Sequence, residues 1–119
     1  LNQIKQSTAV GISQFTEKDF DFGEERILDN IQIVKNVKNE ENGYYVVLAI
    51  HSDVSKRNDF ITKAIATGQA DINFFYDVNT SKYYIYYSKF NSIDEARRAM
   101  QSSETKPYNS KMSVVKIEN

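Results

Sequence analysis

The chain contains no cysteine and no tryptophan, one proline, one histidine and four glycines. Without cysteine it can form no disulfide, no thiolate metal site and no cysteine nucleophile, although the redox compartment stays open. No apolar run approaches the roughly 20 residues that a spanning helix needs, so no direct membrane insertion is expected. The formal net charge of −1 disfavours nucleic acid as a partner, because nucleic-acid modules usually display clustered Lys and Arg.

Catalytic motifs are also missing from the sequence. There is no Gly-rich phosphate loop, no His-Glu-x-x-His and no nucleophile elbow. His51 has no partners grouped with it, and we interpret it as a structural residue at a strand-to-helix turn. Capping and the helix dipole explain Asp94 and Glu95. We therefore predict a protein that is not an enzyme, with no catalytic residue, no metal and no cofactor.

The eight tyrosines and seven phenylalanines gather mostly between residues 44 and 90, where an internal repeat lies. The run Tyr-Tyr-Val-Val-Leu-Ala-Ile-His-Ser from Tyr44 aligns without gaps on Tyr-Tyr-Ile-Tyr-Tyr-Ser-Lys-Phe-Asn from Tyr83, at an offset of 39 residues. Each copy is typical of a β-strand that leads through a polar turn into a helical pattern. The repeat indicates that one strand-and-helix unit has been used twice.

The patterns between residues 43 and 119 predict four strands and two helices. Helices are expected at 55–67, ended by Gly68, and from Ser92, where Ser92 and Glu95 have the spacing of a capping box. Strands are expected at 44–50, 70–76, 82–88 and 112–117. The order βαββαβ predicts an α+β, split-βαβ (ferredoxin-like) sandwich. Its four antiparallel strands would lie in the spatial order 4-1-3-2, with both helices on one face and the other face open.

Residues 1–42 do not share the repeat. Ile27, Leu28, Ile31 and Val34 fit a helical stripe, whereas Ile31-Gln32-Ile33 alternates like a strand, so two periods compete. We expect this segment to be a linker from a preceding domain or a docking arm. The chain begins with Leu and shows no signal sequence, which is typical of a processed product or an excised fragment.

The strand motifs of residues 43–119 resemble those of a SPOR domain, the sporulation-related repeat. The strand from Tyr44 resembles its opening Tyr-x-Val-x-Val-Gly-x-Phe, and Tyr83–Phe90 with Ser92-Ile93-Asp94-Glu95-Ala96 resembles its second copy. The chain departs from the pattern at Val47, Ala49 and His51, where glycan-binding members usually carry Gln, Gly and Phe. The Asn-Phe-Phe-Tyr-Asp run and the Tyr-rich strand look like a variant found in Bacteroidota envelope proteins, including ones linked to gliding motility and type IX secretion.

The resemblance implies a non-catalytic module of the periplasm or of the outer-membrane-associated envelope that binds peptidoglycan glycan strands. The alternative is a protein–protein interaction module that assembles subunits of an envelope machine. The loss of the family's Gln at Val47 favours this alternative.

Strand alternation selects the residues that could meet a ligand. If Val46, Leu48 and Ile50 face the helices, the open face carries the predicted ligand-binding residues Tyr45, Val47, Asn73, Phe75, Tyr84, Tyr86 and Ser88. Such rings could stack on sugars. Equally, residues 1–42 or a neighbouring subunit could bury them. RNA-recognition domains also stack bases on a sheet, but their basic Gly-rich signature is missing here.

Overall fold

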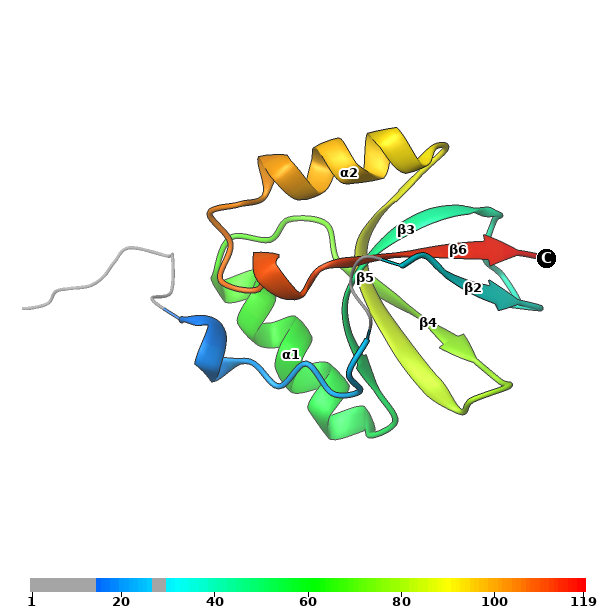
Figure 1. The fold of residues 1–119 in the computed structure, drawn as a ribbon. Helices are drawn as coiled ribbons and strands as arrows, with labels where there is room; N and C mark the ends of the chain where they lie inside the picture. The colour runs from blue at the N-terminus through cyan, green and yellow to red at the C-terminus, as the bar shows by residue number, and fades with distance from the viewer. Residues whose placement is uncertain (1–14, 27–29) are drawn as a thin grey trace, which may run out of the picture.

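The computed structural model describes residues 15–26 and 30–119 and shows an α+β fold (Figure 1). The chain runs through the short 3₁₀ turn η1 (Glu17–Asp19) and the first strand β2 (Gln32–Lys35) into β3 (Gly43–His51). It continues through helix α1 (Val54–Ala66), the hairpin strands β4 (Asn73–Asp77) and β5 (Lys82–Phe90), and helix α2 (Ile93–Ser102). A second 3₁₀ turn, η2 (Asn109–Lys111), leads into the last strand, β6 (Ser113–Glu118).

The strands form one curled sheet in the order β2-β6-β3-β5-β4. The four strands from β3 onward lie in the predicted spatial order and pair antiparallel, with β3 between β5 and β6. The prediction of a purely antiparallel four-stranded sheet is wrong, because β2 adds a fifth strand parallel to β6. Figure 1 shows α1 and α2 on one side of the sheet and β2 beside β6.

Both helices begin within a residue of the predicted position, and α1 also ends within a residue of it. The Asp53 carboxylate accepts a hydrogen bond from the Lys56 amide at 3.1 Å and caps α1, and Gly68 follows its end with a positive φ of 94°. Ser92 caps α2 by accepting from the Glu95 amide at 3.2 Å. The Glu95 carboxylate turns back to the Asn91 amide, also at 3.2 Å.

The pairing of β3 with β5 contains two bulges that follow the sequence repeat. Val46 lies opposite Ser88 and Val47 opposite Tyr86, which skips Tyr87; Ala49 then lies opposite Ile85, which skips Leu48. Leu48 and Tyr87 are equivalent positions of the 39-residue repeat, and so are Val47 and Tyr86. The two copies are therefore related by a local two-fold axis through the Val47–Tyr86 pair.

The sheet separates two hydrophobic cores. The helix-side core packs the strands against α1 and α2 and contains Val46, Leu48, Ala49, Phe60, Ala64, Ile85, Ala96 and Tyr108, with Ile61 against it. Ile85 and Leu48 are completely buried in this core. The inner core lies on the opposite face and contains Val34, Val37, Tyr45, Val47, Ile50, Phe75, Tyr84, Val115 and Ile117. Ile50 was expected to face the helices, but the bulge at Leu48 reverses the alternation after it.

The described part of the N-terminal segment belongs to the domain. The Phe20 ring packs in the helix-side core with its centroid 5.1 Å from that of Phe60 and 5.3 Å from that of Tyr108. Gly23 forms a parallel bridge with Ile50. A linker free of the domain is thus the wrong interpretation for these residues, and the strand period prevails over the helical one at 32–35. Ile27 and Leu28 of the proposed helical stripe lie outside the described residues.

Candidate functional site

The five apolar and aromatic residues predicted to form a binding platform do share one face of the sheet. The Tyr45 ring centroid lies 5.6 Å from that of Phe75 and 4.8 Å from that of Tyr86. Phe75 and Tyr84 stack with a centroid distance of 4.8 Å and an interplanar angle of 9°. Val47 lies among them in the inner core. Strand alternation therefore predicted correctly that these five side chains share one face.

That face is covered rather than open. Tyr45 and Tyr84 are each 2% exposed, and Val47 is completely buried. The cover is the N-terminal segment, because β2 pairs with β6 and brings Val34 onto the rings, followed by Val37 from the next loop. The expectation of an open aromatic face is wrong, and burial by residues 1–42, the other interpretation, describes this face.

The hydroxyl groups of the three tyrosines bond to the covering segment. The Tyr84 hydroxyl accepts a hydrogen bond from the side-chain Nε2 of Gln32 at 2.6 Å, and the Tyr45 hydroxyl donates to the Glu41 backbone carbonyl at 2.7 Å. Tyr86 donates to the Glu40 carboxylate at 3.0 Å. Burial, together with the nearby Glu40 and Glu41 charges, raises the pKa of Tyr45 to about 12. These donors and acceptors are already used within the chain.

Of the two polar residues predicted for the platform, Asn73 lies on the predicted face, because it is opposite Tyr86 and two residues before Phe75, whereas Ser88 does not. Asn73 lies at the edge of the sheet opposite Tyr86, and its side-chain oxygen accepts from the Phe74 amide at 2.8 Å. Ser88 lies opposite Val46 of the helix-side core, because the bulge at Tyr87 reverses the alternation of β5. Its placement on the platform is therefore wrong.

A second group of rings lies on the helix side of β4 and β5, where α1 covers it only in part. We call Phe74, Tyr76 and Tyr83, with Arg57 of α1, the outer aromatic cluster. Tyr76 is 41% exposed, and its ring centroid lies 4.9 Å from that of Tyr83. Tyr83 meets Phe74 edge to face at 5.6 Å. The cluster thus presents aromatic surface to the solvent, whereas the inner core does not.

The sequence held a signal for this cluster that strand alternation alone does not reveal. The polar turn after Asp77 closes a hairpin in which Asp77 lies opposite Lys82 and Tyr76 opposite Tyr83. Counting back from that turn would have paired the two tyrosines. The prediction considered only the face opposite the helices, whereas Tyr76 on the helix side is 41% exposed.

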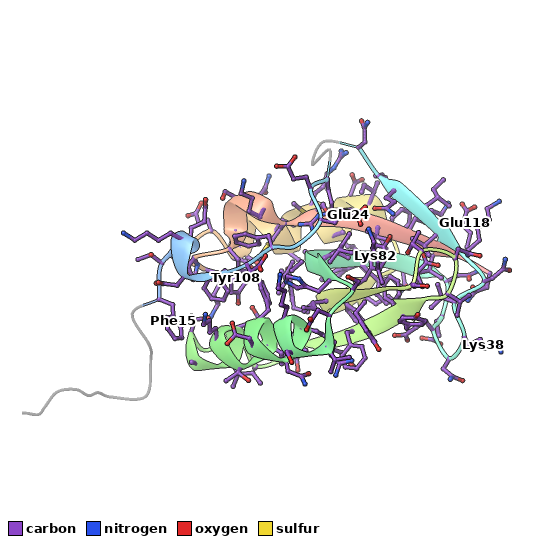
Figure 2. All side chains as sticks on the ribbon, turned by 90° about the horizontal axis from the view of Figure 1, so that it is seen from below. Phe15, Glu24, Lys38, Lys82, Tyr108 and Glu118 are labelled. Atoms are coloured by element: carbon purple, nitrogen blue, oxygen red, sulfur yellow. The ribbon has the colours of Figure 1, made fainter. Side chains whose placement is uncertain are left out.

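His51 anchors the N-terminal segment. It is 4% exposed, and its Nε2 donates to the Asp21 carbonyl at 2.6 Å. Ion pairs surround it, with Lys56 and Asp21 3.8 Å apart and Lys82 bonded to Glu24 (Figure 2). These contacts agree with a structural role, although the bond runs to residue 21 rather than to the turn itself.

The part of the chain that the structure describes contains no group of three His, Asp or Glu side chains placed to hold a metal ion. Within the same residues, no helix is long and apolar enough to cross a membrane. Comparisons with protein-family models, with curated proteins and with solved structures found no match for the chain.

Proposed function

We propose that this chain is a non-catalytic binding module of the cell envelope, in the periplasm or associated with the outer membrane, and that it binds peptidoglycan glycan strands on the outer aromatic cluster. The SPOR-like motifs support the compartment and the ligand class. The observation that carries the proposal is the exposure of Tyr76 beside Tyr83 on a surface that also holds Arg57.

The chemistry of sugars fits this cluster. Pyranose rings present C–H faces that stack on aromatic rings, and their hydroxyl and amide groups bond to polar neighbours. The inner core cannot offer such a surface, since Tyr45 and Tyr84 are buried and their hydroxyls are bonded internally. The exposed rings therefore replace the predicted platform as the contact for a glycan.

A protein–protein interaction module of an envelope machine, linked to gliding or type IX secretion, is the second candidate. One observation favours it: the edge strand β2 and the residue before it expose Ile33 and Ile31 at 53% and 37%. Branched aliphatic side chains on a sheet edge suit a polypeptide partner better than a sugar, because an added strand can pair with the edge.

The test is sedimentation of the whole chain with purified peptidoglycan sacculi, comparing wild type with Tyr76→Ala and with Tyr76→Ala/Tyr83→Ala. Stacked rings contribute roughly 0.5–1.5 kcal/mol each beyond buried area, so losing two should weaken binding about tenfold to a hundredfold. Tyr76→Ala should give part of this loss with little effect on folding, because its ring is exposed.

Tyr44→Ala is the matched control. Tyr44 lies at the start of β3, whereas Tyr83 pairs with the end of that strand. The Lys116 ammonium lies 5.5 Å from the Tyr44 ring centroid, so this residue is also an aromatic ring beside a cation, but away from the cluster. Circular dichroism checks the folding of every variant. Wild-type binding by a folded double variant would exclude the cluster. A wild-type chain that stays in the supernatant would exclude the glycan, and the Ile31–Ile33 edge would then be tested with envelope proteins.

A further inference from the structure

The guanidinium of Arg57 lies over two rings of the outer aromatic cluster. Its guanidinium carbon lies 4.1 Å from the Phe74 ring centroid and 4.6 Å from that of Tyr83. The Nε and Nη2 atoms both donate to the Asn58 side-chain oxygen, at 3.1 and 2.9 Å. The contacts with the two rings hold the position of the group, and the paired bonds to Asn58 hold its rotation. The remaining edge of the guanidinium is oriented before any ligand arrives.

Arg57 has no carboxylate within ion-pair distance among residues 15–26 and 30–119. The carboxylate one turn before Arg57 in the chain is committed elsewhere, because Asp53 caps α1. Five lysines of the chain do have acidic partners, in the pairs Lys56–Asp21, Lys63–Asp59, Lys82–Glu24, Lys89–Glu41 and Lys116–Glu118. Arg57 is therefore a preoriented cation whose charge the described residues leave unpaired.

We infer that Arg57 reads a carboxylate carried by the stacked sugar itself, so that the ligand is an acidic saccharide rather than a neutral one. This inference rests on the proposed function. Arginine offers a planar pair of donors that matches a carboxylate, and a guanidinium already stacked on rings loses little further freedom on binding. Because the guanidinium carbon lies within 5 Å of two ring centroids of the cluster, a carboxylate on the stacked sugar itself is within its reach.

The experiment uses soluble glycan chains prepared from peptidoglycan, either with free carboxylates or with the same carboxylates methyl-esterified. Esterification removes the charge and leaves the sugar rings unchanged. Wild type should bind the free form about tenfold more tightly, which corresponds to one charge-assisted hydrogen-bonded pair. This preference should shrink as ionic strength rises, because the pair is partly exposed.

Arg57→Gln should bind both forms equally, at the level that wild type shows for the esterified chains. Arg57→Lys should keep part of the preference, because it restores the charge but not the planar fork. Arg97→Gln on the exposed surface of α2 is the matched control and should behave as wild type.

The outcomes separate the two proposals. An Arg57→Gln variant that keeps the wild-type preference would overturn the role of Arg57 and leave glycan binding intact. A wild-type chain that binds both forms equally would show that the carboxylate charge does not contribute to binding, and would overturn the role of Arg57. If wild type binds neither form, the proposed function itself fails.

Discussion

Each tyrosine of the inner core combines a ring packed against apolar side chains with a hydroxyl that reaches the covering segment. Tyr84 shows the two parts clearly, because its ring stacks on Phe75 and its hydroxyl accepts from Gln32. The ring contributes through burial and dispersion, which scale with the area removed from water. The single hydrogen bond contributes less, because the unfolded chain replaces it with water.

Replacing Tyr84 measures both parts. Tyr84→Ala should lower the free energy of unfolding by about 3–5 kcal/mol, as expected for deleting a buried aromatic ring, and so by at least as much as the 2–4 kcal/mol expected for Ile85→Ala in the helix-side core. Tyr84→Phe keeps the ring and should cost only about 0.5–1.5 kcal/mol. Urea unfolding gives the three values. A Tyr84→Ala loss far below that of Ile85→Ala would mean that the inner core is solvated.

At this scale the sequence predicted direction but not exposure. The period of two in a strand places Tyr84 and Tyr86 on the face opposite Ile85, and the structure agrees. Whether that face meets water depends on a segment more than 40 residues earlier in the chain, and no local pattern around Tyr84 contains this information. A bulge also makes the predicted side-chain direction wrong, because one extra residue turns the side chains after it to the opposite face of the sheet. Ser88 and Ile50 are the two examples here.

Residues 20–24 cross the end of β3 and form a second connection of the N-terminal segment to the sheet, besides the pairing of β2 with β6. The Ile50 amide donates to the Phe22 carbonyl at 3.1 Å, and the Glu24 amide donates to the Ile50 carbonyl at 2.9 Å. Gly23 sits between them with a φ of 72°, and a Cβ atom there would lie 1.8 Å from the Ile50 carbonyl oxygen. Only glycine allows this approach.

Gly23→Ala should therefore destabilise the chain by about 2 kcal/mol or more, since it adds a left-handed backbone penalty to a clash with rigid backbone. Gly68→Ala is the control. It also has a positive φ, but the nearest atom to its Cβ would be the end of Lys106 at 3.5 Å, so it should show the backbone penalty alone. Thermal unfolding of the two variants compares them. Equal losses would show that the crossing at Ile50 can shift without cost.

The elements differ in how far the sequence determines them. Helix limits follow from local chemistry at Asp53, Gly68 and Ser92, and they were predicted to within a residue or two. β2 was ambiguous because its four residues are too few to establish a period, and because its strand conformation depends on pairing with β6 more than 80 residues later. The candidate site was missed for a related reason, since the exposure of Tyr76 depends on where α1 ends over the sheet.

The whole molecule is a symmetric pair of strand-and-helix units with a cover that breaks the symmetry. The repeat relates β3 to β5. The N-terminal segment lies outside the repeat and contributes Phe20 to the helix-side core and Val34 and Val37 to the inner core. The loop after β2 is also hydrogen-bonded to the C-terminal residue. The Asn119 side chain accepts from the Val37 backbone amide at 2.7 Å and donates to the Glu40 carbonyl at 2.8 Å. Lys38 of this loop and Glu118 of β6 mark that end of the sheet in Figure 2.

Truncation tests whether residues 43–119 form a domain on their own. A fragment of these residues keeps the repeat but loses the cover of the inner core, so Tyr45, Phe75, Tyr84 and Val115 would meet water. An exposed apolar face of this kind weakens cooperative packing and binds hydrophobic dyes. The fragment should show a broad, early urea transition and strong ANS fluorescence, whereas residues 15–119 should unfold in one cooperative step with little dye binding.

The double variant Val34→Asn/Val37→Asn in the longer chain should have a urea midpoint and dye response closer to those of the fragment, because it places two amides over the rings while keeping the chain length. A fragment with the midpoint and dye response of the longer chain would show that residues 15–42 pack on a domain already stable without them.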